Sequence, residues 1–393
     1  TGTTPTTSTV VVTPSYTNNS VSCPGTTQSF TYTINPTPSV VSSPDFTLCN
    51  GESSSIVSLS GTGTSYSWTN SNTAIGLAAS GTDFIPSFQG VNAGNGPITG
   101  NITVTPLYTN GGLTCQGIAD QILVTINPTP TVLDPLDQVV CNNSSTSGVI
   151  FSGNATSYTW TNLTSGIGLA ASGTGTITPF TAINTGASPI IATVNVTPQY
   201  TGTNLTCPGL PQSFTFTINS SPIVANPIDQ IVCNGVSTSL VNFSGTGMSY
   251  TWTNNTPGIG LAASGSGNIN PFTAINTSLS PLNAQVVVTP NSTVNGLTCS
   301  GVSQGLIFTI NPTPGLIDPT DQVVCNGAAT AATVFSGNGT SYSWTNSNPA
   351  IGLTASGLGN IPSFTAINTG NFPIVTTITV LPNFTGGAVS CNG

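Results

Sequence analysis

A period of 92 residues runs through this 393-residue chain and constrains its fold more than any other feature, because each period has to form one structural module. No insertion or deletion interrupts the spacing. Three series show the period: Cys49, Cys141, Cys233 and Cys325; Trp68, Trp160, Trp252 and Trp344; and Ile34, Ile126, Ile218 and Ile310. A second cysteine series keeps the same step, at Cys23, Cys115, Cys207, Cys299 and Cys391.

The period predicts a tandem array. We expect a partial repeat over residues 1–35, the final β-hairpin of a preceding domain. It is followed by a first repeat at 36–127, a second at 128–219, a third at 220–311 and a fourth at 312–393, which lacks its last strand.

Each repeat consists of short strand patterns separated by turn residues. The segment Phe214-Thr-Phe216-Thr-Ile218 alternates large apolar residues with threonine, which is typical of a half-buried strand. About seven such strands in 92 residues, and no apolar pattern with helical spacing, predict an all-β fold. We expect antiparallel β-sandwiches of immunoglobulin-like or PKD-like type.

The recurring tryptophans are predicted to fill the core between two sheets. Tyr66 and Trp68 share one face of their strand, whereas Ser67 and Thr69 take the other. The alternative hypothesis is an exposed aromatic that stacks on sugar.

The charge composition excludes several functions. The chain has no lysine, arginine or histidine and only 9 acidic residues. It therefore has no basic surface for phosphate or nucleic acid, no imidazole for catalysis and no side-chain salt bridges. No apolar run reaches the length of a membrane helix. Glu52, Asp83 and Asp120 occur in one repeat only, which argues against a catalytic carboxylate pair and against an enzyme.

The cysteines predict disulfides in an oxidising extracellular setting, because no Cys-x-x-Cys pair is present for zinc. Two pairing schemes fit the spacing, and the sequence does not decide between them. Only one can hold, because a disulfide needs Cα atoms within about 7 Å. Pairing within repeats gives Cys49–Cys115, Cys141–Cys207, Cys233–Cys299 and Cys325–Cys391, and Cys23 pairs outside residues 1–393. Pairing across junctions gives Cys49–Cys207, Cys141–Cys299 and Cys233–Cys391.

One aspartate per repeat, four residues before the first cysteine, is a weak calcium candidate. These residues are Asp45, Asp137, Asp229 and Asp321. One or two carboxylates are few for calcium, and a local cap on the backbone beside a proline is the favoured interpretation. We therefore expect no catalytic residue and no cofactor.

Five motifs recur in a constant order: Val-Cys-Asn-Gly, Tyr-x-Trp-Thr, Val-Thr-Pro, Leu-Thr-Cys-x-Gly and Thr-Ile-Asn-Pro. In this order they resemble the PKD-like repeats of very large Bacteroidota surface adhesins of the gliding-motility type, which are exported by the type IX secretion system. The resemblance covers nearly the whole chain. It implies a surface-displayed repetitive stalk and transfers no catalytic residue.

The favoured hypothesis is a structural repeat segment of an extended extracellular adhesin stalk or filament, with neighbouring repeats as its main partners. Two alternatives remain: a self-assembling filament subunit joined to other copies by strand addition, and a module that binds surface polysaccharide. No nucleic acid and no membrane insertion are expected.

Overall fold

The computed structural model describes residues 2–393, and its regular elements are β-strands and three short 3-10 helices. The architecture is all-β, built from immunoglobulin-like sandwiches. By its contacts the chain divides into two compact units, which are described separately. The first comprises Thr1–Gln138, Ser145–Thr181 and Ile191–Phe216, and the second comprises Val139–Ser144, Ala182–Ile190 and Thr217–Gly393.

The strands before the first repeat are β1 (Thr6–Val12), β2 (Ser15–Asn18), β3 (Val21–Pro24) and β4 (Gln28–Ile34). Those of the first repeat are β5 (Phe46–Cys49), β6 (Val57–Ser58), β7 (Ser65–Asn70), β8 (Ser80–Thr82), β9 (Phe84–Ile85), β10 (Ile98–Asn110), β11 (Leu113–Gln116) and β12 (Asp120–Asn127). The helix η1 (Thr73–Ile75) lies between β7 and β8.

The second repeat contains β13 (Gln138–Cys141), β14 (Ser157–Asn162), β15 (Ser172–Thr174), β16 (Ile190–Gly202), β17 (Leu205–Pro208) and β18 (Gln212–Asn219). The third contains β19 (Gln230–Cys233), β20 (Ser249–Asn254), η2 (Pro257–Ile259), β21 (Ser264–Ser266), β22 (Leu282–Val294), β23 (Leu297–Ser300) and β24 (Gln304–Asn311). The fourth contains β25 (Leu316–Ile317), β26 (Ser336–Gly337), β27 (Ser341–Asn346), η3 (Pro349–Ile351), β28 (Ser356–Leu358), β29 (Ile378–Gly386) and β30 (Val389–Asn392).

The main sheet of the first repeat has the strand order β5-β12-β10-β7-β8, with β11 paired to β10. A second layer is made of the short β6–β9 ladder and of isolated bridges such as Val40↔Gly61. The sheet around β22 in the third repeat has the same order, β19-β24-β22-β20-β21, with β23 paired to β22.

The predicted all-β, immunoglobulin-like sandwich is confirmed, with one strand pair that is parallel and not antiparallel. The first and last strands of a repeat pair in parallel, β5 with β12 and β19 with β24. Parallel pairing needs a long crossover, and the strands between the first and the last supply it.

The core of the first repeat is formed by the buried residues of β10 and β12, which alternate with more exposed ones along each strand. On β12, Ile122, Val124 and Ile126 are at most 1% exposed, while the residues between them face outward. Burying each of these side chains stabilises the fold by about 1.5–3 kcal/mol. Trp68, at 2% exposure, fills the same core.

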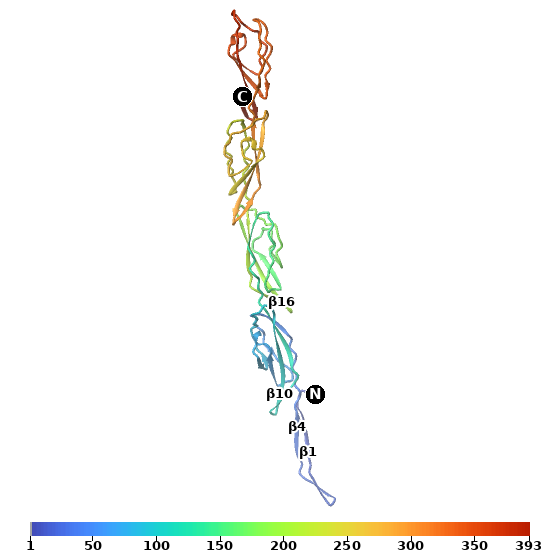
Figure 1. Cartoon of the computed structure of the whole chain (residues 1–393). Helices are drawn as coiled ribbons and strands as arrows, with labels where there is room; N and C mark the ends of the chain where they lie inside the picture. The colour runs from blue at the N-terminus through green and yellow to red at the C-terminus, as the bar shows by residue number, and fades with distance from the viewer. Residues whose placement is uncertain (1) are drawn as a thin grey trace. The chain divides into compact units, whose positions relative to one another are not determined.

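One strand of each repeat is much longer than its neighbour. In β10, residues 98–104 pair with β12, whereas Leu107–Asn110 pair with β11 in a separate hairpin (Figure 1). The turn residues Gly111 and Gly112 both have positive φ, 60° and 83°, which suits the right-handed twist of a two-residue hairpin. This hairpin carries the second cysteine series, with Cys115 on β11.

The chain before the first repeat forms two ladders, β1 with β4 and β2 with β3 (Figure 1, blue). Every residue of β4 is exposed, including Phe30 at 48%, Tyr32 at 61% and Ile34 at 69%. These strands therefore have no apolar core of their own.

Candidate functional site: disulfide junctions between repeats

Three disulfides join residues 158 positions apart, each with Cα atoms 5.6 Å apart. They are Cys49–Cys207, Cys141–Cys299 and Cys233–Cys391. Of the two pairing schemes left open by the sequence, the structure contains the one across junctions. Each bond links the end of the first strand of one repeat to the projecting hairpin of the next.

Pairing within repeats is wrong, and Cys115 and Cys325 carry no disulfide in residues 2–393. The reason is geometric, because the first strand of a repeat ends beside the hairpin of the following repeat. Contacts between β5 and β17 and between β19 and β30 record this arrangement. A step of 158 from Cys115 or Cys325 leads outside residues 1–393. Cys23 is also free and exposed.

Burial accompanies each bond on the hairpin side. Cys207, Cys299 and Cys391 are 1%, 2% and 3% exposed. The unbonded Cys23 of the same series is exposed, and Cys115 is intermediate. The bonded hairpin is therefore packed against the preceding repeat as well as tethered to it.

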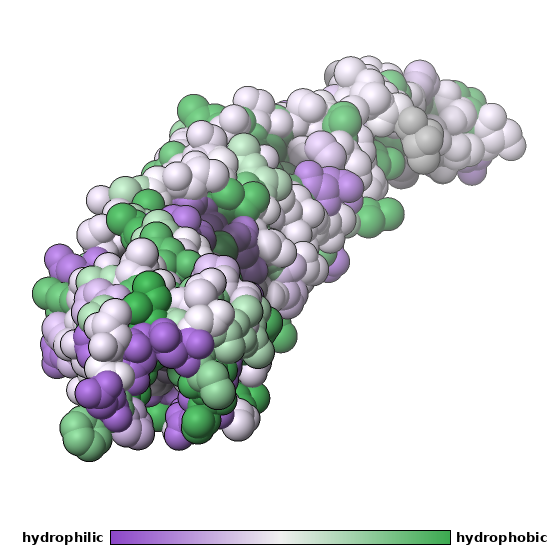
Figure 2. Space-filling view, turned by 90° about the horizontal axis from the view of Figure 1, so that it is seen from above, coloured by the Kyte–Doolittle hydropathy of each residue, from purple (hydrophilic) through white to green (hydrophobic). Residues whose placement is uncertain are grey.

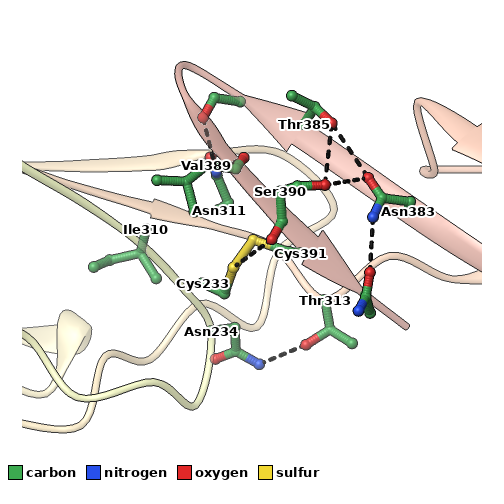
Figure 3. The surroundings of a disulfide bond; sticks show 12 residues. Cys233, Asn234, Ile310, Asn311, Thr313, Asn383, Thr385, Val389, Ser390 and Cys391 are labelled. Atoms are coloured by element: carbon green, nitrogen blue, oxygen red, sulfur yellow. Dashed lines mark hydrogen bonds between the residues drawn. A yellow bond between two sulfur atoms is a disulfide. The ribbon is translucent and has the colours of Figure 1, made fainter.

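An asparagine lies next to each disulfide, and two of these, Asn219 and Asn311, donate a side-chain hydrogen bond to the hairpin of the next repeat. Figure 3 shows the surroundings of Asn311. Asn311 lies opposite Cys233 in the parallel register, and its Nδ2 donates to the Gly386 carbonyl at 3.0 Å. Its own carbonyl accepts the Asn234 N–H at 2.9 Å, and Asn234 Nδ2 donates to Thr313 Oγ1 at 2.8 Å. One short segment thus joins the end of the third repeat to the hairpin of the fourth.

The equivalent asparagine in the first repeat, Asn127, is fully buried against the hairpin residue Gly202. A Cβ at Gly202 would lie 2.6 Å from Asn127 Oδ1, so a larger residue there would require the asparagine side chain to shift. The glycine of Leu-Thr-Cys-x-Gly has a similar role, since a Cβ at Gly301 would lie 1.6 Å from the Pro222 carbonyl oxygen. The sequence did not lead us to predict a role for Asn127 or Gly301, although the asparagine recurs at 35, 127, 219 and 311 and the glycine at 25, 117, 209, 301 and 393.

The repeated aspartates bind backbone rather than one another. Asp229 Oδ1 accepts the Ile307 N–H of β24 at 2.7 Å, and Asp45 Oδ1 accepts the Leu123 N–H of β12 at 2.8 Å. Asp137 does the same for Thr215 at 2.6 Å. These three carboxylates therefore cap the last strand of their repeat and not their own turn, whereas Asp321 makes no such bond within residues 2–393. Within residues 2–393, no three acidic, cysteine or histidine side chains group together as ligands for a metal ion.

The three acidic residues unique to the first repeat also have structural partners. Glu52 Oε2 accepts the Cys49 N–H at 2.9 Å, and Asp83 Oδ1 accepts the Tyr66 N–H at 3.1 Å. Asp120 Oδ2 accepts the Ser42 hydroxyl at 2.8 Å. Among the titratable side chains, partial burial raises the pKa of the Tyr158 phenol above its ordinary value.

All four predicted core tryptophans are buried, with 2–7% exposure. Two hollows, about 360 and 490 Å³, lie beside Trp252 and Trp344. Their other lining residues are mostly serine and threonine of neighbouring strands, with no second aromatic ring. Because the ring of Trp252 is 7% exposed, it offers no open face for stacking on a sugar.

The surface is mixed in character. Figure 2 shows apolar and hydrophilic residues interspersed on the face in view. In residues 2–393 no helix has the length and apolarity needed to span a membrane.

No family model matches the chain, and no curated protein matches its sequence significantly. Among solved structures it is similar to the human desmocollin-1 ectodomain, at 10% identity over 94% of this chain and 81% of that chain, with a TM-score of 0.29. It is also similar to EC22–24 of mouse cadherin-23, at 12% identity over 70% and 99% and a TM-score of 0.30. A third is Sidekick-1 immunoglobulin domains 1–5, at 14% identity over 98% and 93% and a TM-score of 0.24. At these scores the likenesses carry no functional information.

Proposed function

We propose that this chain is a structural, load-bearing segment of an extracellular bacterial adhesin stalk. The observation that supports this most directly is the set of three disulfides that connect successive repeats. The role needs neither a catalytic residue nor a cofactor. Its partners are the neighbouring repeats.

The disulfides overlap along the sequence, and this has a mechanical consequence. The shortest covalent path runs from Thr1 to Cys49, across to Cys207, on to Cys233 and across to Cys391. Residues 50–206 and 234–390 lie outside that path. A pulling force applied at the ends is therefore borne by disulfides even if the repeats unfold.

The location follows from the same bonds. Disulfides persist in oxidising compartments outside the cytoplasm. The repeat motifs resemble those of Bacteroidota surface adhesins. We therefore place the chain at the cell envelope of a bacterium of that phylum, with export by the type IX secretion system and a contribution to gliding. Antibodies against the chain should label intact cells, and the labelling should disappear when type IX secretion is disabled.

Single-molecule pulling tests the load-bearing role. With disulfides intact, we expect the ends to separate to roughly a fifth of the contour length reached after reduction, since extended chain spans about 3.4 Å per residue. The paired substitution Cys49→Ser and Cys207→Ser should raise this limit to roughly half, because the path must then run through the first repeat. Full extension of the oxidised protein would contradict the proposal.

A further inference from the structure

The loops that the three disulfides close overlap along the chain. We call the bonds, in chain order, the first (Cys49–Cys207), the second (Cys141–Cys299) and the third (Cys233–Cys391). The second bond starts inside the loop of the first and ends outside it, and the third bond has the same relation to the second. Every peptide bond between Cys49 and Cys391 is therefore spanned by at least one disulfide.

The overlap matters most in the stretch between Cys207 and Cys233. The first bond ends where this stretch begins and the third begins where it ends, so the second bond is the one that spans it. A chain cut there stays joined, because a covalent path still runs from Cys207 back to Cys141 and across to Cys299. The second bond takes no part in the shortest covalent path of the intact chain, so it bears load only after a cut.

The overlap also covers any two cuts. A cut divides the backbone but leaves the disulfides in place, so the ends stay linked as long as one route of uncut segments and bonds joins them. Between Cys49 and Cys391 every pair of cuts leaves such a route. Separation of the ends needs at least three cuts, and one of them must lie between Cys207 and Cys233.

Exposed apolar residues in loops leave the chain open to extracellular proteases. Ile118, Ile150 and Ile228 lie outside strands and are 86%, 81% and 84% exposed. Leu136 and Leu210 also lie outside strands and are 85% and 80% exposed. Exposed loops are the preferred sites of proteolytic nicking. The absence of lysine and arginine removes the sites of trypsin-like enzymes but not those of proteases that select apolar side chains.

We propose that the overlapping disulfides keep the stalk covalently continuous after proteases have cut its backbone. Each cut adds water across one peptide bond, which leaves a carboxylate and an amine, and does not change the S–S bonds. After a cut between residues 207 and 233, residues 141–207 and 233–299 enter the load-bearing path, which becomes longer but does not break. This inference rests on the proposed stalk function, yet it depends on the second bond, which the load path of the uncut chain does not use.

The composition of the chain makes the proposal testable with trypsin. Because the chain has no lysine and no arginine, one introduced arginine gives trypsin one site. Four exposed residues outside strands are suitable, and none of them precedes a proline: Ile118, Ile150, Ile228 and Val302. Free thiols are first alkylated, and digestion is carried out in dilute urea so that each site is accessible. A reducing denaturing gel shows whether the backbone was cut, and a non-reducing gel shows whether the pieces are still linked.

A single cut tests the second bond. Oxidised Ile228→Arg protein should give two fragments on the reducing gel but one species of full mass without reduction. Combining it with Cys141→Ser and Cys299→Ser removes the second bond, so the same cut should then release two fragments without reduction. The matched control is Ile118→Arg in that serine background, which should stay linked through the first bond.

Three cuts test the overlap as a whole. The triple variant Ile118→Arg, Ile150→Arg and Ile228→Arg should separate into two disulfide-linked products of about equal length. Each product combines pieces that are not adjacent in the sequence, and mass mapping without reduction would identify them: residues 1–118 with 151–228, and residues 119–150 with 229–393.

The matched control has three cuts but spares the stretch between residues 207 and 233. With Val302→Arg in place of Ile228→Arg, the oxidised protein should keep its full mass without reduction. Separation of this control, or of the oxidised Ile228→Arg protein by its single cut, would overturn the proposal. The second of these results would leave the first and third bonds in place, and with them the load-bearing role. Failure of that role would instead appear in the pulling experiment, as full extension of the uncut oxidised protein.

Discussion

The third and fourth repeats share nearly all their motifs, yet their cores differ. Val286 and Val288 of β22, which pairs with β24, are fully buried, whereas their counterparts Ile378 and Val380 of β29 are only partly buried. The comparison shows that the last strand of a repeat does more than close an edge. It flanks the central strand and adds buried side chains to the same core, and it is the hydrogen-bonding partner of the first strand.

Hydrogen exchange on dilute, monomeric protein would measure the difference in opening free energy between β22 and β29 directly. Leu306, Phe308 and Ile310 of β24 are at most 1% exposed, and each contributes about 1.5–3 kcal/mol. Opening β22 should therefore cost at least about 4 kcal/mol more than opening β29, which is roughly a thousandfold in protection of the amides. Similar protection of the two strands would show that the buried side chains of the last strand are not what stabilises the sandwich.

Removing one ring from the last strand should make the third repeat behave more like the fourth. Phe308 is fully buried and packs edge to face on Phe272, with ring centroids 5.2 Å apart. We expect Phe308→Ala to lower the free energy of opening of β22 by about 3–5 kcal/mol, measured by hydrogen exchange in increasing urea.

The matched control for this substitution is the neighbouring residue on the outer face. Ile307 is 42% exposed, so Ile307→Ala should cost less than about 1 kcal/mol. Equal losses for the two variants would mean that the register of β24 differs from the one described.

Local sequence patterns predicted much of this architecture. Alternation in the last strand places Phe214, Phe216 and Ile218 in a core, and the Tyr-x-Trp pattern places the tryptophan beside them. Both predictions depend only on the two-residue period of a strand. The parallel pairing of the first and last strands has no such local signal, because it depends on contacts between residues about 80 positions apart.

The disulfide pairing remained open for a related reason. A constant spacing of cysteines fits either scheme, and the choice depends on which hairpin lies next to the end of a first strand. That position follows from the length of β10, which continues past the residues paired with β12 and carries its hairpin beyond the sheet. Strand length of this kind is set by tertiary contacts, whereas the sequence pattern shows only that a strand is present.

The smallest expected effect comes from the aspartate that precedes the first strand. Asp229 accepts the Ile307 N–H, so Asp229→Ala should destabilise the third repeat by about 1 kcal/mol. In the separate chain the equivalent Asp321 makes no such bond within residues 2–393, and Asp321→Ala should leave the stability of the fourth repeat unchanged. Urea unfolding followed by hydrogen exchange would resolve both values. A loss of stability in the dilute monomer would show that Asp321 already has a partner there, and the two repeats would then differ less than their sheets suggest.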